Sequence, residues 1–445
     1  MSQATISLQQ QEGGRESPPA ASPPSSSSSP SPPGSLLAAP RQTLFQQGAG
    51  DTFRVPALLY LPPAGTFLAF AERRGSPRDE DAKHLVMRRG QRQGDRVQWG
   101  PLEDLSALVL PGHRTMNPCP LYDARTGTVF LFCICVERGK TEAWQLRWSR
   151  SAARLCCSRS ADAGRSWAPL RDLTRQALGT ALSRWATFAV GPGHGVQLAS
   201  GRLVVPAYAY YVHWRLCGAL PLPCSTRQHS LVLYSDDGGH SWHRGGLLAG
   251  GQTGECQVAE LSGGDAHQPL LYCSARARRG CRAVAVSGDG GVRFGQPRLC
   301  QALSEPPRGC QGSVVSFSPP RRLRAGSSEW LLYSHPTNRH RRSDLGIYLN
   351  PSPLDGAAWG HPWVLQPGPA AYSDLASCLG GVFGCLFECG TSSSCEEIAF
   401  CLFSLGTSTH GQQDPEADLV LGAGGEGAGL APQQDLLAAQ QLPGS

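Results

Sequence analysis

Arginine, tyrosine and glutamate side chains of this sequence occur within or beside short apolar segments, where they could act together. Arg54, Arg276 and Arg342 are examples, and the planar guanidinium of arginine suits the binding of a carboxylate because it donates two parallel hydrogen bonds. A tyrosine such as Tyr372 acts as a nucleophile only where a carboxylate takes its proton as the bond forms. Taken singly, each residue has a more ordinary role, on the surface for the charged residues and in packing for the tyrosine.

The elements that must hold these side chains are predicted to be strands. The chain has 53 glycines and 36 prolines, which favour many short connections over long helices. Short apolar segments rich in β-branched or aromatic residues, bounded by glycine or proline, recur without helical periodicity at residues 57–61, 66–71, 129–132, 202–206, 230–234 and 330–333. Such a chain is an all-β sandwich, barrel or propeller.

An eight-residue repeat distinguishes among these folds. Residues 160–167 and 235–242 both read Ser-X-Asp-X-Gly-X-X-Trp, and residues 287–294 repeat the pattern with phenylalanine in place of tryptophan. The pattern is typical of a turn in which aspartate accepts backbone N–H groups, glycine takes a conformation closed to other residues, and the aromatic ring packs on the sheet. Three copies at turn positions indicate propeller blades, and we assign them a structural role.

This repeat is the Asp box of sialidases, and two further motifs extend the resemblance. Residues 53–56, Phe-Arg-Val-Pro, resemble the family's F/Y-R-I-P motif, and residues 372–375 match its Y-S-D-L segment. The motifs occur in family order over residues 43–404. The resemblance implies a six-bladed β-propeller and an exo-α-sialidase, or neuraminidase, a glycoside hydrolase that removes terminal α-linked sialic acids. It also implies retention of configuration through a covalent tyrosyl intermediate.

Three residues receive catalytic roles from this resemblance. Tyr372 would be the nucleophile and Glu255 the carboxylate that takes its proton, with Glu260 as a nearby alternative. Asp79, in a loop after the segment at 66–71, would protonate the glycosidic oxygen or activate water. That role requires burial under the bound substrate, which favours the protonated carboxyl group.

The remaining candidate residues would bind the substrate. Arg54, Arg276 and Arg342 would hold its carboxylate, with Arg341 as a competitor one position away. Glu72 would orient Arg54, and Arg74 would add a substrate contact. Glu142 would lie in a loop that contacts the glycerol chain of the sugar. The other residues expected to line the pocket are Val55, Met116, Asn117, Tyr208, Tyr210 and Gln311.

Composition sets the domain organisation. Residues 1–42 are rich in proline and serine and are predicted to be disordered, residues 43–404 form the catalytic propeller, and residues 405–445 form a flexible tail with a short helix near 436–442. No signal peptide is visible, so the 17 cysteines are expected to be buried free thiols. Their spacing is not that of a structural zinc site, and no metal or cofactor is expected.

Within the family, the closest resemblance is to the membrane-associated type that prefers gangliosides. It implies sialylated glycolipids and glycoproteins as partners and peripheral attachment to the plasma membrane, with endosomal or lysosomal membranes as further locations. Trp214, Arg215 and Leu216 are candidates for the contact with lipid. A cytosolic-type sialidase acting on soluble glycoconjugates and a non-catalytic glycan-binding propeller are the alternatives. The net charge of +6 is too scattered to indicate nucleic-acid binding.

Overall fold

The computed structural model describes residues 34–48, 50–213, 215–216, 220–221, 226–250, 252–262, 268–319 and 329–406. Most of the proline- and serine-rich segment, the tail beyond residue 406 and the predicted helix at 436–442 lie outside the described residues. Trp214 also lies outside them, and for Arg215 and Leu216 only the backbone is described.

Nearly all regular structure in the described residues is β-strand, as predicted. The first sheet contains β3 (Thr52–Leu61), β4 (Thr66–Arg74), β5 (Ala82–Gln93), β6 (Arg96–Trp99) and β7 (Glu103–Asp104). The second sheet contains β8 (His113–Asp123), β9 (Thr128–Glu137), β10 (Ala153–Ser160) and β11 (Arg171–Asp172). The third sheet contains β12 (Trp185–Val190), β13 (Val196–Gln197), β14 (Leu203–Val212), β17 (Thr226–Ser235) and β18 (His243–Arg244).

The remaining strands form a fourth sheet, an eight-stranded fifth sheet and a small hairpin. The fourth sheet contains β19 (Thr253–Leu261), β20 (Leu270–Ala277), β21 (Cys281–Ser287) and β22 (Arg298–Ser304). The fifth contains β23 (Ser313–Phe317), β24 (Trp330–Pro336), β25 (Ser343–Asn350), β26 (Trp363–Ser377), β27 (Val382–Cys389), β28 (Glu397–Gly406), β1 (Ser35–Ala38) and β2 (Gln42–Gln46). The hairpin is β15 (Arg215–Leu216) with β16 (Leu220–Pro221).

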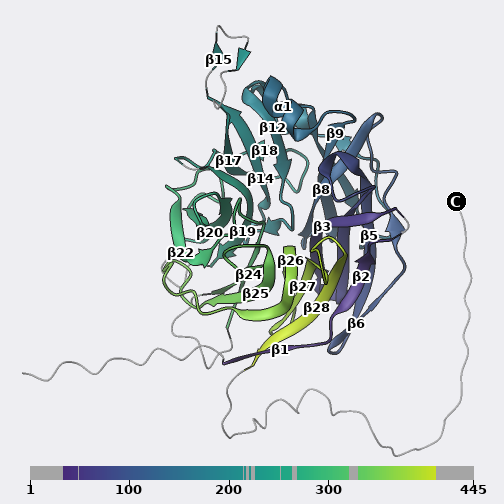
Figure 1. The fold of residues 1–445 in the computed structure, drawn as a ribbon, viewed down its shortest axis with the longest axis vertical. Helices are drawn as coiled ribbons and strands as arrows, with labels where there is room; N and C mark the ends of the chain where they lie inside the picture. Colours follow the sequence, from purple (N-terminus) through teal and green to yellow (C-terminus); the bar gives the residue numbers. More distant parts are fainter. Residues whose placement is uncertain are drawn as a thin grey trace, which may run out of the picture. The chain divides into compact units, whose positions relative to one another are not determined.

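The sheets follow one another around a common centre in a propeller-like arrangement. In Figure 1 the colours run around this centre from purple through teal and green to yellow, so that the yellow strand β28 lies beside the purple strand β2. Inner strands of neighbouring sheets contact one another around the ring, and β26 of the last sheet contacts β3 of the first. The chain therefore closes on itself at the seam between β26 and β3.

The N-terminal strands complete this closure. Both β1 and β2 pair antiparallel with β28. A strand therefore lies before the boundary predicted at residue 43, because the Leu36–Leu37 segment pairs with β28 within a region otherwise poor in apolar residues. Pairing with β28 gives the backbone N–H and C=O groups of these two strands hydrogen-bond partners within the protein.

The six segments predicted as strands lie in strands, except that residue 202 precedes the start of β14, but short helices were missed. They are α1 (Glu142–Trp148), α2 (Thr174–Leu178) and three 3₁₀ helices, η1 (Pro62–Ala64), η2 (Asp79–Asp81) and η3 (Gly179–Arg184). Glu142 therefore starts a helix and does not lie in a loop. The side chain of Thr141 caps that helix by accepting a hydrogen bond from the backbone N–H of Trp144 at 3.0 Å. None of the described helices is long and apolar enough to cross a lipid bilayer.

The three Asp boxes are turns built alike. In the second box the hydroxyl of Ser235 donates to Asp237 at 2.7 Å and accepts from the Gly239 N–H, while the Ser241 N–H donates to Asp237. The boxes at 160–167 and 287–294 repeat these bonds. The predicted turn chemistry is confirmed in all three.

Each box also fastens its sheet to the preceding one. A Cβ atom at Gly239 would lie 2.5 Å from the ring of Phe130 in the second sheet, so only glycine fits there. The indole of Trp242 is buried against Phe130 and Phe132, with ring centroids 6.0 and 4.6 Å away. Gly291 approaches Val232 of the third sheet in the same way. The aromatic residue of the repeat therefore stabilises the packing between sheets.

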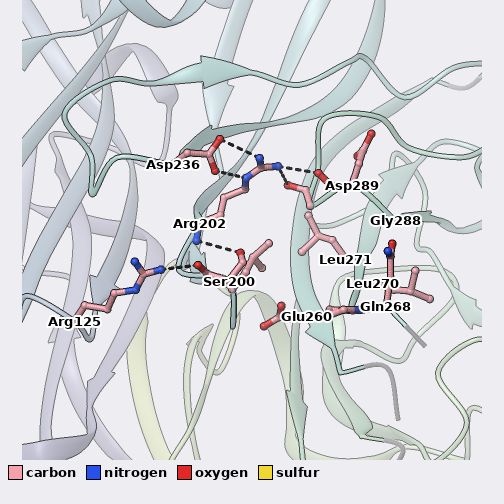
Figure 2. A pocket seen from close by; sticks show the side chains of 13 residues that line it. Arg125, Ser200, Arg202, Asp236, Glu260, Gln268, Leu270, Leu271, Gly288 and Asp289 are labelled. Carbon is pink, nitrogen blue, oxygen red and sulfur yellow. Dashed lines mark hydrogen bonds and ion pairs between the residues drawn. The ribbon is translucent and has the colours of Figure 1, made fainter. Parts of the chain in front are cut away.

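Arg202 links two of these boxes beside a cavity of about 480 Å³ (Figure 2). Its guanidinium forms an ion pair with Asp236 at 2.6 Å and donates to the backbone carbonyl of Asp289 at 2.8 Å. The carboxylate of Glu260 also lines this cavity, at the end of β19.

The cores between the sheets are apolar and contain most of the thiols. Every cysteine among the described residues is a free thiol, and all except Cys395 are buried. Burial raises the pKa of the Cys157 thiol to about 12, so that this thiol stays neutral in the core.

We expect Trp242→Ala to lower the free energy of unfolding by about 3–5 kcal/mol, because it removes a buried indole from the junction of two sheets. Trp148, which is 54% exposed, is the matched control, and Trp148→Ala should change stability by less than about 0.5 kcal/mol. Urea unfolding followed by circular dichroism measures both. Equal, small effects of the two substitutions would show that the box does not hold the sheets together.

Candidate active site

The candidate site residues lie where the inner strands depart from regular pairing. β-Bulges re-aim side chains at such positions, and the registers shift between Arg54 and Ala57, Met116 and Cys119, Thr253 and Cys256, and Ala370 and Ser373. Val55 and Asn117 have the positive φ angles 59° and 57°, which are unusual for residues with a side chain. The irregular strands direct the candidate side chains of four sheets toward one cavity.

Tyr372, Glu255 and Arg276 form a hydrogen-bonded group in that cavity. The phenol of Tyr372 donates to Oε1 of Glu255 at 2.5 Å. The Nη1 atom of Arg276 donates to Oε2 of Glu255 at 2.7 Å and to the phenol oxygen at 3.2 Å. The carboxylate can therefore take the phenol proton while the guanidinium stabilises its charge.

The phenol is held in its neutral form. Burial and the nearby charge of Glu255 raise the pKa of Tyr372 well above its usual value, against the opposing charges of Arg276 and Arg342. A tyrosine in this setting needs a base to remove its proton as it reacts, and Glu255 is in hydrogen-bond contact for that purpose.

Arg54 is oriented by Glu388, which corrects the expectation that Glu72 does so. Nε of Arg54 donates to Glu388 at 2.8 Å and Nη2 at 3.2 Å. The same fully buried carboxylate accepts the N–H groups of Val55 and Tyr372. Glu388 thus holds the first arginine and the backbone of the tyrosine together.

Glu72 performs a different task, although it lies opposite Arg54 in the pairing of β3 with β4. Its fully buried carboxylate accepts from Arg74 and from the backbone N–H of Asn117 at 2.7 Å. Arg74 in turn donates to Asp79 at 2.7 Å. Glu72 therefore positions Arg74 and the bulge of β8, whereas the Asp79 carboxylate is 64% exposed beside the cavity.

Arg276 and Arg342 are held by one loop between β22 and β23. The backbone carbonyl of Arg308 accepts from Nε and Nη2 of Arg276 at 3.0 and 2.7 Å, and that of Gly309 accepts from Arg342 at 2.9 Å. Arg342 lines the cavity, whereas its competitor Arg341 is exposed and does not line it. The three arginines Arg54, Arg276 and Arg342 are called the clamp below.

The cavity around Tyr372 has a volume of about 940 Å³. Asp79, Glu142, Tyr208, Tyr210, Glu255, Tyr372 and the clamp line it. A narrower recess of about 80 Å³ shares several of these residues and is also lined by Arg74, Met116 and Asn117. The phenol of Tyr210 donates to Glu142 at 2.9 Å, which places the start of α1 against this recess.

Neither the cavity nor the recess is lined by Gln311, Glu72 or Glu260. Gln311 instead stabilises β26, the strand that contains Tyr372. Its side-chain amide donates to the Ser373 carbonyl at 2.9 Å and accepts from the Ser373 N–H at 3.0 Å. Glu72 is buried behind Arg74, as described. Glu260, the alternative to Glu255, lies in the separate cavity of Figure 2 and accepts from Ala199 there.

Two buried groups were missed by the sequence analysis. Glu388 interrupts the apolar strand β27, and a charged residue in such a segment is a signal of a buried partner. Glu305 and Arg282 form a fully buried ion pair at 2.9 Å behind the loop that holds the clamp. Glu305 accepts from the N–H of Cys310, and Arg282 donates to its carbonyl.

The sequence is similar to those of known sialidases. Residues 65–385 match the family model described as a BNR repeat-like domain. The chain is 54% identical to human Sialidase-3 over 394 residues, covering 81% of this chain and 91% of that protein. It is 44% identical to mouse Sialidase-4 over an alignment of 454 positions, which covers 82% of this chain and 93% of that protein.

Solved structures share the fold. The microbial sialidase Hz136 aligns with a TM-score of 0.64 at 23% identity, over 80% of this chain and 66% of that one. The Trypanosoma rangeli sialidase in complex with the inhibitor DANA aligns with a TM-score of 0.62 at 18% identity, over 82% and 60% of the two chains. The propeller-like fold, the grouped tyrosine, glutamate and arginines, and the identity to these relatives lead to one conclusion: the chain belongs to the sialidase family and is an exo-α-sialidase, a glycoside hydrolase.

Proposed function

We propose that the chain hydrolyses terminal α-linked sialic acids with retention, through a covalent bond to Tyr372. The observation that carries this proposal is the short hydrogen bond from the Tyr372 phenol to Glu255 inside a cavity lined by three arginines. A neutral phenol is suited to this substrate, because a carboxylate nucleophile would be repelled by the carboxylate of the sugar.

The clamp would bind the sugar carboxylate. Arg54, Arg276 and Arg342 reach the cavity from β3, β20 and the start of β25. Buried or backbone acceptors fix each guanidinium, which pre-organises it for hydrogen bonds to the substrate carboxylate. Cation–π contacts of Arg54 and Arg342 with the Tyr372 ring, at 5.6 and 5.5 Å, add to this order.

The reaction would proceed in two balanced steps. In the first, the Tyr372 oxygen attacks the anomeric carbon, its proton passes to Glu255, and Asp79 gives a proton to the departing glycosidic oxygen. In the second, Asp79 takes a proton from water, whose oxygen attacks the anomeric carbon, and the tyrosine oxygen regains its proton from Glu255. Substrate lying over Asp79 would shield its exposed carboxyl group from water.

Gangliosides are the proposed preferred substrates, with peripheral contact at the plasma membrane and at endosomal or lysosomal membranes. The support is the similarity to Sialidase-3 proteins, at 51–54% identity for four mammals, together with the sequence motifs shared with the ganglioside-preferring type. The docking role of residues 214–216 stays a prediction.

The ring is proposed to have six blades. The long strand β26 supports this count, because residues 363–369 pair with β25 whereas residues 370–377 pair with β27. Its two halves would then belong to successive blades, and the eight-stranded sheet would contain two of them.

We expect Tyr372→Phe to lower kcat/KM for a sialoside by on the order of 10²–10⁴-fold, because phenylalanine has no oxygen to bond the anomeric carbon. Tyr122→Phe is the matched control, since Tyr122 lies in β8 outside the cavity, and it should keep normal turnover. Circular dichroism of both variants checks that the fold is kept. A Tyr372→Phe enzyme within tenfold of the wild type would remove Tyr372 from its role.

The substrate proposal is tested by measuring sialic acid release from a ganglioside in mixed micelles and from a soluble sialoglycoprotein side by side. We expect kcat/KM for the ganglioside to be at least about tenfold higher. Fractionation of expressing cells adds a second readout, since a peripheral protein is stripped from membranes by alkaline carbonate. Equal rates on the two substrates, with all protein in the soluble fraction, would favour the cytosolic type.

A further inference from the structure

The cavity of Tyr372 continues beyond the clamp. Past Arg276 and Arg342 its wall is formed by residues from β17 and from the segments after β20 and β22, namely Gln228, Arg278, Pro307 and Arg308. None of these four residues lines the recess around Met116 and Asn117. A cavity of this size holds a drug-sized ligand, so one terminal sugar leaves this part of the wall to the remainder of the substrate.

Two arginines, Arg278 and Arg308, give this part of the wall positive charge. Arg278 and Arg308 are both exposed, and neither forms an ion pair with a carboxylate of the described residues. Arg278 lies near the reaction centre, because its charge opposes the rise in the pKa of Tyr210 that burial and Glu142 cause. Two unpaired guanidinium groups therefore stand beside a clamp that already suffices for one carboxylate.

The loop that contains Arg308 has a fixed backbone conformation. Arg308 has a φ angle of 67°, in the left-handed region that residues with a side chain rarely adopt. Two residues further on, both backbone groups of Cys310 are fixed by the buried pair of Glu305 and Arg282. The imidazole of His335 contacts the same Glu305 carboxylate at 3.2 Å. A rigid loop holds Arg308 in a strained conformation at the cavity.

We propose that Arg278 and Arg308 form a second anion subsite, which binds the carboxylate of a further sialic acid next to the terminal one. This proposal rests on the proposed sialidase function and assigns it two specificity-determining residues, which would favour glycans that carry two adjacent sialic acids. Guanidinium groups match a carboxylate with paired, charge-assisted hydrogen bonds, whereas a neutral sugar would leave both charges without a counter-ion. The clamp is occupied by the terminal carboxylate, so the second anion must come from the next residue of the glycan.

The test compares α2,3-sialyllactose with α2,8-disialyllactose as soluble substrates for the full chain. Arg278→Ala removes one guanidinium, and Arg308→Asn removes the other while keeping a residue type that tolerates positive φ and the carbonyl that Arg276 needs. Arg279→Ala is the matched control, because Arg279 is the exposed neighbour of Arg278 and does not line the cavity.

We expect each subsite variant to lower kcat/KM for the disialylated substrate by about tenfold or more, as loss of a charged hydrogen bond does, and we expect Arg278→Ala to affect the monosialylated substrate far less. Arg279→Ala should follow the wild type on both. Equal losses on the two substrates, or none on either, would overturn the proposal. A loss seen only on ganglioside in phosphatidylserine vesicles, and not on the soluble disialylated glycan, would assign these arginines to the membrane instead. Wild-type cleavage of sialyllactose tests the sialidase function separately.

Discussion

The fully buried carboxylate of Glu388 holds the seam on which the candidate site depends. It lies in β27 and accepts hydrogen bonds from the Arg54 side chain and the Val55 N–H of the first sheet, and from the Tyr372 N–H of the last. A buried charge is costly unless it is paired and hydrogen-bonded. The partners of Glu388 come from the first and the last sheets, so they surround its carboxylate only when the ring is closed. Arg54 of the clamp and the nucleophile are thereby brought together by the same interaction that closes the fold.

Other buried carboxylates repeat this arrangement around the ring. Glu72 holds the bulge of β8 through the Asn117 N–H, and Glu305 holds the loop of the clamp through Cys310. Asp374 accepts from the Leu58 N–H, the Ser313 hydroxyl and His194 near the centre. The N–H groups of Asn117, at a bulge, and of Cys310, in a loop, thus find carboxylate acceptors where regular strand pairing supplies none. The irregularity that aims the site residues is therefore stabilised from behind the cavity.

The sequence predicted the fold and most residues of the cavity because their signals are local. An Asp box is complete within eight residues, and Arg54 is recognisable from its immediate neighbours in Phe53-Arg54-Val55-Pro56. Partners distant in sequence were not predictable in the same way. Arg54 and Glu388 are 334 residues apart, and the sequence favoured Glu72, which is nearer and even lies opposite Arg54 in the sheet. At the bulge beside Val55, Arg54 pairs with Glu388 and not with Glu72. The residues around Arg54 in the sequence give no sign of this bulge. The helix at Glu142 was missed for a related reason, since its single cap at Thr141 is weak evidence beside so many strands.

The central claim is that Tyr372 forms a covalent bond with the sugar. It is tested most directly with a sialosyl fluoride that carries a second fluorine beside the anomeric carbon, because this fluorine slows hydrolysis of the intermediate. After incubation, proteolysis and tandem mass spectrometry locate the added sugar. The account predicts one modification, on the oxygen of Tyr372, and none in Tyr372→Phe. A sugar attached to Glu255 or Asp79, or turnover without any labelled protein, would contradict it.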